Sequence, residues 1–229
     1  MDGKIFAYCE RGQDPSFWAE PINALTNAAF IIAATIGLVL WSQRPVGERG
    51  IIEIVLVGIV FAIGTGSFLF HTFAEPWAAA ADTIPIGIFM VSYLAYALAR
   101  YLRWHPIAVV VALVVFFIAL WQSSVFRCNG GPCFNGSLAY APAFLALVLI
   151  GGWLVLRKQA EGSYVLGAGL VFVVSLTFRT LDQDICSQTQ IAGFGPIGLH
   201  FLWHILNAIV LGLLLVAAMR FGMVRRPTT

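Results

Sequence analysis

Charged residues are scarce in this sequence. Only 10% of its 229 residues are Asp, Glu, Lys or Arg, whereas 60% are hydrophobic, and the mean hydropathy is +0.88. A soluble domain needs much more polar surface than this composition offers, so an ordinary soluble protein is excluded. The sequence also lacks a polybasic tract, and a net charge of +2 gives no reason to expect nucleic acid as a partner. The chain is therefore predicted to be an integral membrane protein.

Lysine is almost absent. The only two lysines, Lys4 and Lys158, lie outside the hydrophobic centre of every apolar run. Because a retinal Schiff base needs a lysine amine, a rhodopsin-like photoreceptor or pump is excluded. No internal repeat is evident, which weakens the case for a transporter built from inverted repeats. No linker, soluble domain or low-complexity tail interrupts the chain, so residues 1–229 are predicted to form one domain.

What the sequence has in abundance is long apolar runs. A helix needs about 20 such residues to cross a hydrocarbon layer of roughly 30 Å. None of the runs alternates with the period of two that is typical of a transmembrane barrel strand. The fold class is therefore all-α, a polytopic membrane bundle of seven transmembrane helices, with spans predicted at 22–42, 50–72, 83–101, 106–123, 138–156, 163–180 and 195–219.

The basic residues between the spans predict the orientation of the bundle. Nine of them fall on one side of a seven-span chain, namely Arg44, Arg49, Arg100, Arg103, Arg157, Lys158, Arg220, Arg225 and Arg226. The other side has four: Lys4, Arg11, Arg127 and Arg179. The positive-inside rule then places the N-terminus outside and the C-terminus in the cytoplasm. A bacterial inner membrane and a eukaryotic ER, Golgi or plasma membrane fit equally well.

All four cysteines fall in segments assigned to the outer side: Cys9, Cys128, Cys133 and Cys186. An oxidising compartment would let them pair, and four cysteines allow three connectivities. Cys128 and Cys133 share the short loop "CNGGPC", whose glycines permit a tight return, so Cys128–Cys133 together with Cys9–Cys186 is favoured. Free thiols and zinc ligands are the alternatives.

The histidines are the strongest functional candidates. With alternating spans, His71 ends the second span, Asp82 opens the third, and His200 and His204 occupy the first turns of the last, all at similar depth on the outer side. Ionisable residues at membrane depth are costly unless they face a cavity or a partner. The remaining histidine, His105, precedes a proline in a cytoplasmic loop and is predicted to be solvated.

The spacing of these residues predicts a zinc site. Residues i and i+4 share one helical face, so His200 and His204 suit one metal, and His71 would complete the three protein ligands of a catalytic Zn²⁺. Ser67 projects from the same face as His71, and Asp82 is placed to accept a proton from water. Taken singly, a transmembrane histidine often only bonds a neighbouring helix, and a serine hydroxyl often bonds back to a carbonyl one turn earlier. Convergence at one depth favours zinc-dependent hydrolysis.

The segments "SFLFHTF", "DTIP" and "HFLWH", in this order and spacing, resemble the alkaline ceramidase family, within the wider group of the adiponectin and progestin receptors. "WAEPINALTNAAF" and "RTLDQDIC" are similar to that family's first-span and pre-final segments. The resemblance implies a seven-helix zinc amidase that cleaves ceramide, a membrane lipid, to a sphingoid base and a fatty acid. It makes His71, His200 and His204 the zinc ligands, Asp82 the residue that orients and deprotonates water, and Ser67 an oxyanion stabiliser. It also implies a bridge between Cys9 and Cys186.

The resemblance raises a question about calcium. Eukaryotic relatives carry an acidic Ca²⁺ site in the N-terminal segment, and Glu10 and Glu20 match two of its ligands, whereas Ala7 and Gly12 stand where oxygen-bearing side chains are expected. Two carboxylates would make a weak calcium site at best. Alternatively, Glu20 favours the start of the first span through the helix dipole.

Two functions therefore compete. The first is a zinc-dependent hydrolase that cleaves ceramide or a related N-acyl lipid, with its active site toward the outer or lumenal side. The second is a receptor of the adiponectin-receptor type with a mainly structural zinc, against which stands the absence of a large cytoplasmic domain.

Overall fold

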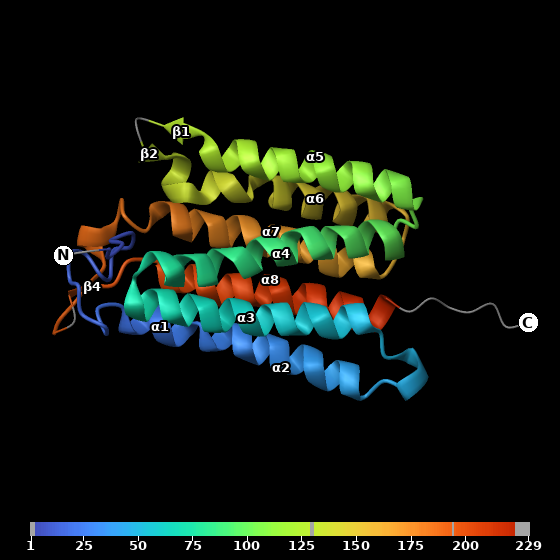
Figure 1. Ribbon diagram of the computed structural model, residues 1–229, viewed down its shortest axis with the longest axis horizontal. Helices are drawn as coiled ribbons and strands as arrows, with labels where there is room; N and C mark the ends of the chain where they lie inside the picture. Colours follow the sequence, from blue (N-terminus) through green and yellow to red (C-terminus); the bar gives the residue numbers. More distant parts are fainter. Residues whose placement is uncertain (1–2, 129–130, 194, 223–229) are drawn as a thin grey trace, which may run out of the picture.

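The computed structural model describes residues 3–128, 131–193 and 195–222, and these residues form the predicted all-α bundle (Figure 1). Seven helical segments of the described chain are long and apolar enough to cross a membrane. The first span is interrupted at Asn27, which separates the helices α1 and α2. The helices are α1 (Pro21–Thr26), α2 (Ala28–Ser42), α3 (Ile51–Phe73), α4 (Pro76–Arg100), α5 (Pro106–Val125), α6 (Ala141–Leu156), α7 (Glu161–Leu181) and α8 (His200–Phe221).

Two predicted boundaries differ from the structure. Helix α4 begins at Pro76 rather than at residue 83, because proline is well suited to the first helical position and the alanines that follow favour a helix. Asp82 consequently lies in the second turn of α4 and does not open the span. Helix α8 begins at His200 rather than at residue 195, because Gly195 and Gly198 adopt positive φ angles that end the preceding loop.

The short strands gather at one end of the bundle (Figure 1). Two antiparallel ladders pair β1 (Arg127–Cys128) with β2 (Gly131–Pro132) and β3 (Gln190–Ile191) with β4 (Gly195–Pro196). The 3-10 segment η2 (Cys133–Tyr140) follows β2, and η3 (Cys186–Gln188) precedes β3. The remaining 3-10 segment, η1 (Val46–Glu48), connects α2 to α3. The N-terminal segment lies at the same end as both ladders, and α8 ends at the opposite end (Figure 1).

Helix α8 is the centre of the bundle. In its most apolar window 56% of the residues are buried within the protein, compared with 6% for α5, which lies at the edge (Figure 1). Helices α2, α3 and α7 pack around α8. The two histidines at the start of α8 are therefore surrounded by protein rather than by lipid.

Both predicted disulfides are confirmed. Cys9–Cys186 joins the N-terminal segment to η3 across 177 residues, and Cys128–Cys133 closes the turn between β1 and the start of η2. The part of the chain that the structure describes contains no free cysteine.

One glycine sets the approach of α3 to α4. A Cβ on Gly66 would collide with the carbonyl oxygen of Ala81 and approach the backbone nitrogen of Asp82 at 3.1 Å. Small residues allow such close backbone packing between membrane helices. The contact places Ser67, the next residue of α3, beside the turn of α4 that carries Asp82.

Candidate metal centre and its surroundings

Three buried histidines meet where the end of α3 reaches the start of α8. One potential ligand atom from each of His71, His200 and His204 lies within 4.8 Å of the others, and the side chains are at most 1% exposed. The ring centroids are 5.2 Å apart for His71 and His200, and 4.7 Å for each of the other two pairs. His105 is exposed at the start of α5, as predicted.

The imidazoles present nitrogen atoms that suit a metal ion. Nδ1 of His71 pairs with the carboxylate of Glu20 at 2.5 Å, and Nδ1 of His204 with the hydroxyl of Thr26 at 3.0 Å. Within the described residues, Nε2 of His71 and Nδ1 of His200 are buried without a hydrogen-bond partner. Metal-ligating histidines usually bond a carboxylate, carbonyl or other polar group through their second nitrogen. The donor set therefore fits a zinc ion, which favours three protein nitrogens and one open position.

The two predicted catalytic residues lie at the same end. Ser67 and Asp82 are both buried, on turns of α3 and α4 that the Gly66 contact brings together. In the described chain Ser67 does not bond back to its own helix, whereas Thr65 and Thr72 on the same helix do. The Ser67 hydroxyl is thus available to another partner.

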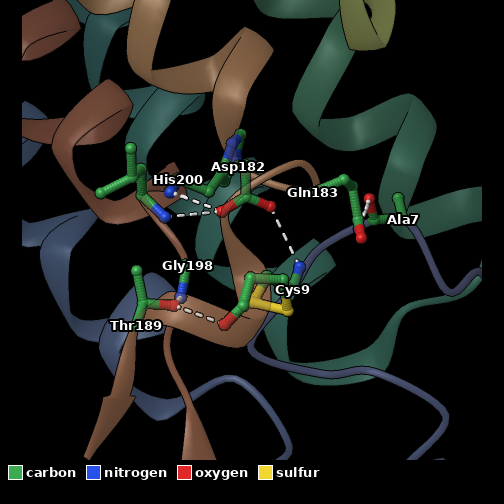
Figure 2. The surroundings of a disulfide bond; sticks show 9 residues. Ala7, Cys9, Asp182, Gln183, Thr189, Gly198 and His200 are labelled. Atoms are coloured by element: carbon green, nitrogen blue, oxygen red, sulfur yellow. Dashed lines mark hydrogen bonds between the residues drawn. A yellow bond between two sulfur atoms is a disulfide. The ribbon is translucent and has the colours of Figure 1, made fainter.

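A residue that the sequence analysis did not single out, Asp182, holds the start of α8 (Figure 2). One carboxylate oxygen accepts the backbone N–H groups of Leu199 and His200, at 2.7 and 2.9 Å. The other accepts the N–H of Cys9 at 3.0 Å, beside the Cys9–Cys186 bridge. Asp182 is 0% exposed, so it ties α7, the N-terminal segment and the first histidine of α8 together.

Gly198 makes this arrangement possible. Its φ of +65° lies in the left-handed region that favours glycine, and a Cβ there would collide with the Asp182 carboxylate and meet the Cβ of Cys9 at 2.6 Å. The turn before α8 can therefore approach Asp182 only without a side chain.

The two glutamates proposed for calcium have protein partners. Glu10 accepts the N–H groups of Ile22 and Asn23, at 2.7 and 2.8 Å, so its side chain bonds the first turn of α1, whereas Glu20 occupies the N-cap position without a side-chain bond to a backbone N–H of that turn. Burial raises the pKa of Glu10, although these two backbone bonds oppose the shift. Glu20 accepts Nε of Arg11 at 2.6 Å as well as bonding His71. Burial alone would raise the pKa of Glu20, but His71 and then Arg11 hold it below the usual value.

Arg11 acts as an internal cation at this place. It is 2% exposed, and its other nitrogens donate to the carbonyl oxygens of four residues, Asp14, Ser16, His71 and Thr72, at distances between 2.9 and 3.4 Å. The guanidinium thus supplies the positive charge beside Glu20 and fixes the N-terminal segment on the end of α3. The calcium site remains a prediction.

An aromatic group adjoins the histidines. The ring of Tyr8 stacks on His200 with centroids 3.7 Å apart, and Nη1 of Arg179 donates to the Tyr8 hydroxyl at 3.2 Å. Burial raises the pKa of Tyr8 to about 12, against the opposing charge of Arg179 and with a further contribution from Asp82. Tyr8 therefore stays neutral and connects the histidine cluster to Arg179.

An apolar cavity lies inside the bundle, on the side of the histidines toward the C-terminal end of α8. Its walls come from α3 to α8 and include Phe89, Tyr140, Phe172, Asn207 and Leu211. Asn207 follows His204 by three residues and so lies on the same face of α8. The aromatic rings of Tyr140 and Phe172 contact Trp203, with centroids 5.1 and 5.9 Å away. The cavity therefore begins one helical turn from the metal-binding group.

The sequence analysis missed Asp182, Arg11, Tyr8 and Arg179. Arg179 and Asp182 lie close to the end of a predicted span, whereas Tyr8 and Arg11 lie within two residues of Cys9, which is predicted to pair, and these positions were the available signal. Each of the four also has a partner between 60 and 173 residues away, and those contacts could not be read from spacing.

Comparison with known protein families identifies the family of the chain. The family model described as Ceramidase matches residues 6–227, nearly the whole chain. No curated protein matches the sequence. The matched region contains all three histidines of the cluster together with Ser67, Asp82 and Asp182, and the chain belongs to the ceramidase family.

Proposed function

We propose that the protein is a zinc-dependent amidohydrolase that cleaves the amide bond of ceramide or a related N-acyl lipid within the membrane, giving a sphingoid base and a fatty acid. The observation that carries the proposal is the convergence of three buried imidazoles from α3 and α8 in a ceramidase-family chain. Histidines with no shared purpose have no reason to meet at one depth in a membrane helix bundle.

In this proposal His71, His200 and His204 hold the zinc ion. When bound, zinc supplies Lewis acidity that lowers the pKa of water to about 7 and polarises a carbonyl. Glu20 and Thr26 fix the orientation of two of the imidazoles through their second nitrogens.

Asp82 and Ser67 supply the remaining chemistry. The Asp82 carboxylate accepts the proton of the attacking water and returns it to the departing amine nitrogen. The Ser67 hydroxyl, which its own helix leaves free, donates a hydrogen bond to the oxyanion. The apolar cavity, which begins near Asn207, would accommodate the acyl chain.

We further propose that the N-terminus and the site lie on the outer or lumenal side and the C-terminus in the cytoplasm. Both disulfides lie at the end of the bundle that carries the histidines, and disulfides persist in oxidising compartments. The basic residues at the opposite end support the same orientation.

The test combines metal content and hydrolysis on the same purified samples. His204→Ala should lose both zinc and fatty acid release, because one of three ligands is removed. Asp82→Asn should keep zinc and lose at least about 100-fold in turnover, as expected for loss of a general base. His105→Ala, at the exposed histidine of the opposite end, is the matched control and should match the wild type in both measurements.

Full hydrolysis by a zinc-free His204→Ala variant would reject the mechanism. Zinc in the wild type without hydrolysis of any N-acyl lipid would favour the receptor function instead.

A further inference from the structure

Arg179, in the last turn of α7, lies in a cage of aromatic rings beside the histidine cluster. The carbon of its guanidinium is 5.8 Å from the ring centroid of Tyr8, 5.5 Å from that of Tyr140 and 5.3 Å from that of Trp203. Aromatic faces attract a cation at these distances, so the three rings fix the position of the charge.

In the part of the chain that the structure describes, no direct ion pair neutralises the charge of Arg179. Among the described residues no carboxylate forms an ion pair with it, and its only hydrogen bond to a side chain goes to the Tyr8 hydroxyl. Its Nε is buried without any hydrogen-bond partner in the same part of the chain. A cation at the edge of a membrane is costly without a partner, and a guanidinium binds carboxylates well. The site thus calls for an anionic ligand.

The position of Arg179 relates it to both parts of the active site. Tyr8 lies between Arg179 and His200, because its ring stacks on the imidazole and its hydroxyl accepts from the guanidinium. On the other side Tyr140 both faces Arg179 and lines the apolar cavity. The guanidinium is therefore placed where the cavity meets the histidine cluster.

Amide hydrolysis creates an anion at this junction. The carbonyl carbon of the amide gains an oxygen from water, its bond to nitrogen breaks, and both protons of the water pass to the nitrogen, which leaves as an ammonium group. The acyl chain then ends in a carboxylate. We propose that Arg179 binds this carboxylate of the fatty acid product while the chain lies in the apolar cavity. The inference rests on the proposed hydrolysis, and it assigns a specific product-binding residue within that site.

The experiment measures binding without turnover. Wild-type protein in lipid nanodiscs is titrated with palmitate and with palmitamide, which has the same chain and no charge, before and after treatment with a chelator. The variants are Arg179→Gln, Arg179→Lys and, as a matched control, Arg127→Gln, which removes an exposed arginine at the same end. Thermal melting of each sample shows whether it is folded. If Arg179→Gln is not folded, Arg179→Lys is used for the binding comparison instead.

Arg179→Gln should weaken palmitate binding about 10- to 100-fold, the loss expected for charge-assisted hydrogen bonds, with palmitamide binding unchanged. Arg179→Lys should give an intermediate value, because it keeps the charge without the planar fork, and Arg127→Gln should bind as the wild type does. Palmitate selectivity should persist after chelation.

Equal palmitate affinity in Arg179→Gln and wild type would overturn the assignment and leave the proposed hydrolysis untouched. If Arg179→Gln loses selectivity for palmitate while the wild type hydrolyses no N-acyl lipid, the results would support the carboxylate site and reject the hydrolysis. A raised KM for N-palmitoylglycine in Arg179→Gln with unchanged palmitate binding would assign the guanidinium to a carboxylate on the substrate and overturn the product assignment.

Discussion

Removal of the Asp182 carboxylate should destabilise the protein strongly, because this one side chain satisfies three buried backbone N–H groups. They belong to Cys9, Leu199 and His200, at distances between 2.7 and 3.0 Å. A hydrogen bond to a charged group contributes about 1.5–3 kcal/mol, and an unsatisfied buried donor costs about 1–3 kcal/mol. Asp182→Ala should therefore lower the free energy of unfolding by about 3–6 kcal/mol.

Asp182→Asn separates the two halves of this interaction. The amide oxygen can still accept from Leu199 and His200, but the amide nitrogen then faces the N–H of Cys9, and the negative charge at the start of α8 is lost. We expect a loss of about 2–3 kcal/mol. At about 2–4 °C per kcal/mol for a chain of this size, Asp182→Asn should lower Tm by about 5–10 °C and Asp182→Ala by about 10–20 °C.

The assay is thermal unfolding in detergent, followed by tryptophan fluorescence, with and without a chelator. Asp184→Asn is the matched control, because Asp184 is exposed two residues further along the chain and should leave Tm unchanged. Since His200 starts the helix that Asp182 holds, Asp182→Ala should also weaken metal binding. A Tm of both Asp182 variants within about 2 °C of the wild type would refute this account of the α8 start.

Three further predictions concern the N-terminal segment. Arg11→Met, which leaves the buried Glu20 without its cation, should cost about 3–5 kcal/mol in chemical unfolding, and a loss below about 1 kcal/mol would contradict the role of Arg11. Replacing the 177-residue Cys9–Cys186 bridge with serines should cost about 5 kcal/mol, compared with about 2 kcal/mol for the 5-residue Cys128–Cys133 bridge, and equal losses in melting would argue against loop closure as the cause. The pKa of Glu10 is raised by burial, so its contribution to stability is fully present below the unfolded value near 4.3 and is lost as pH rises through the folded value. Glu10→Gln should flatten that part of a Tm against pH profile, and an unchanged slope would reject the assignment.

The sequence by itself determined the class of the fold and predicted which three histidines come together. Seven apolar runs can cross a membrane only as helices, because backbone groups in lipid must be satisfied within the segment. The four-residue spacing of His200 and His204 fixes them on one helical face, and alternation of the spans brings His71 to the same side. The short loop "CNGGPC" favoured Cys128–Cys133 together with Cys9–Cys186 over free thiols or zinc ligands, and the structure contains both bridges.

Only the tertiary structure decided how those residues are held. Glu20 pairs with His71, Thr26 with His204 and Asp182 with the N–H of His200, and each contact joins residues from different helices or from a loop and a helix. Helical periodicity fixes which side chains share a face, but it says nothing about which loop closes over that face. The contacts of Asp182 and Arg11 depend on loop closures of up to 173 residues, set by the packing of α3, α7 and α8 and by the Cys9–Cys186 bridge. The same packing leaves Arg179 among aromatic rings without a carboxylate in the described chain, because hydrophobic burial of the rings and the bundle geometry decide its neighbours.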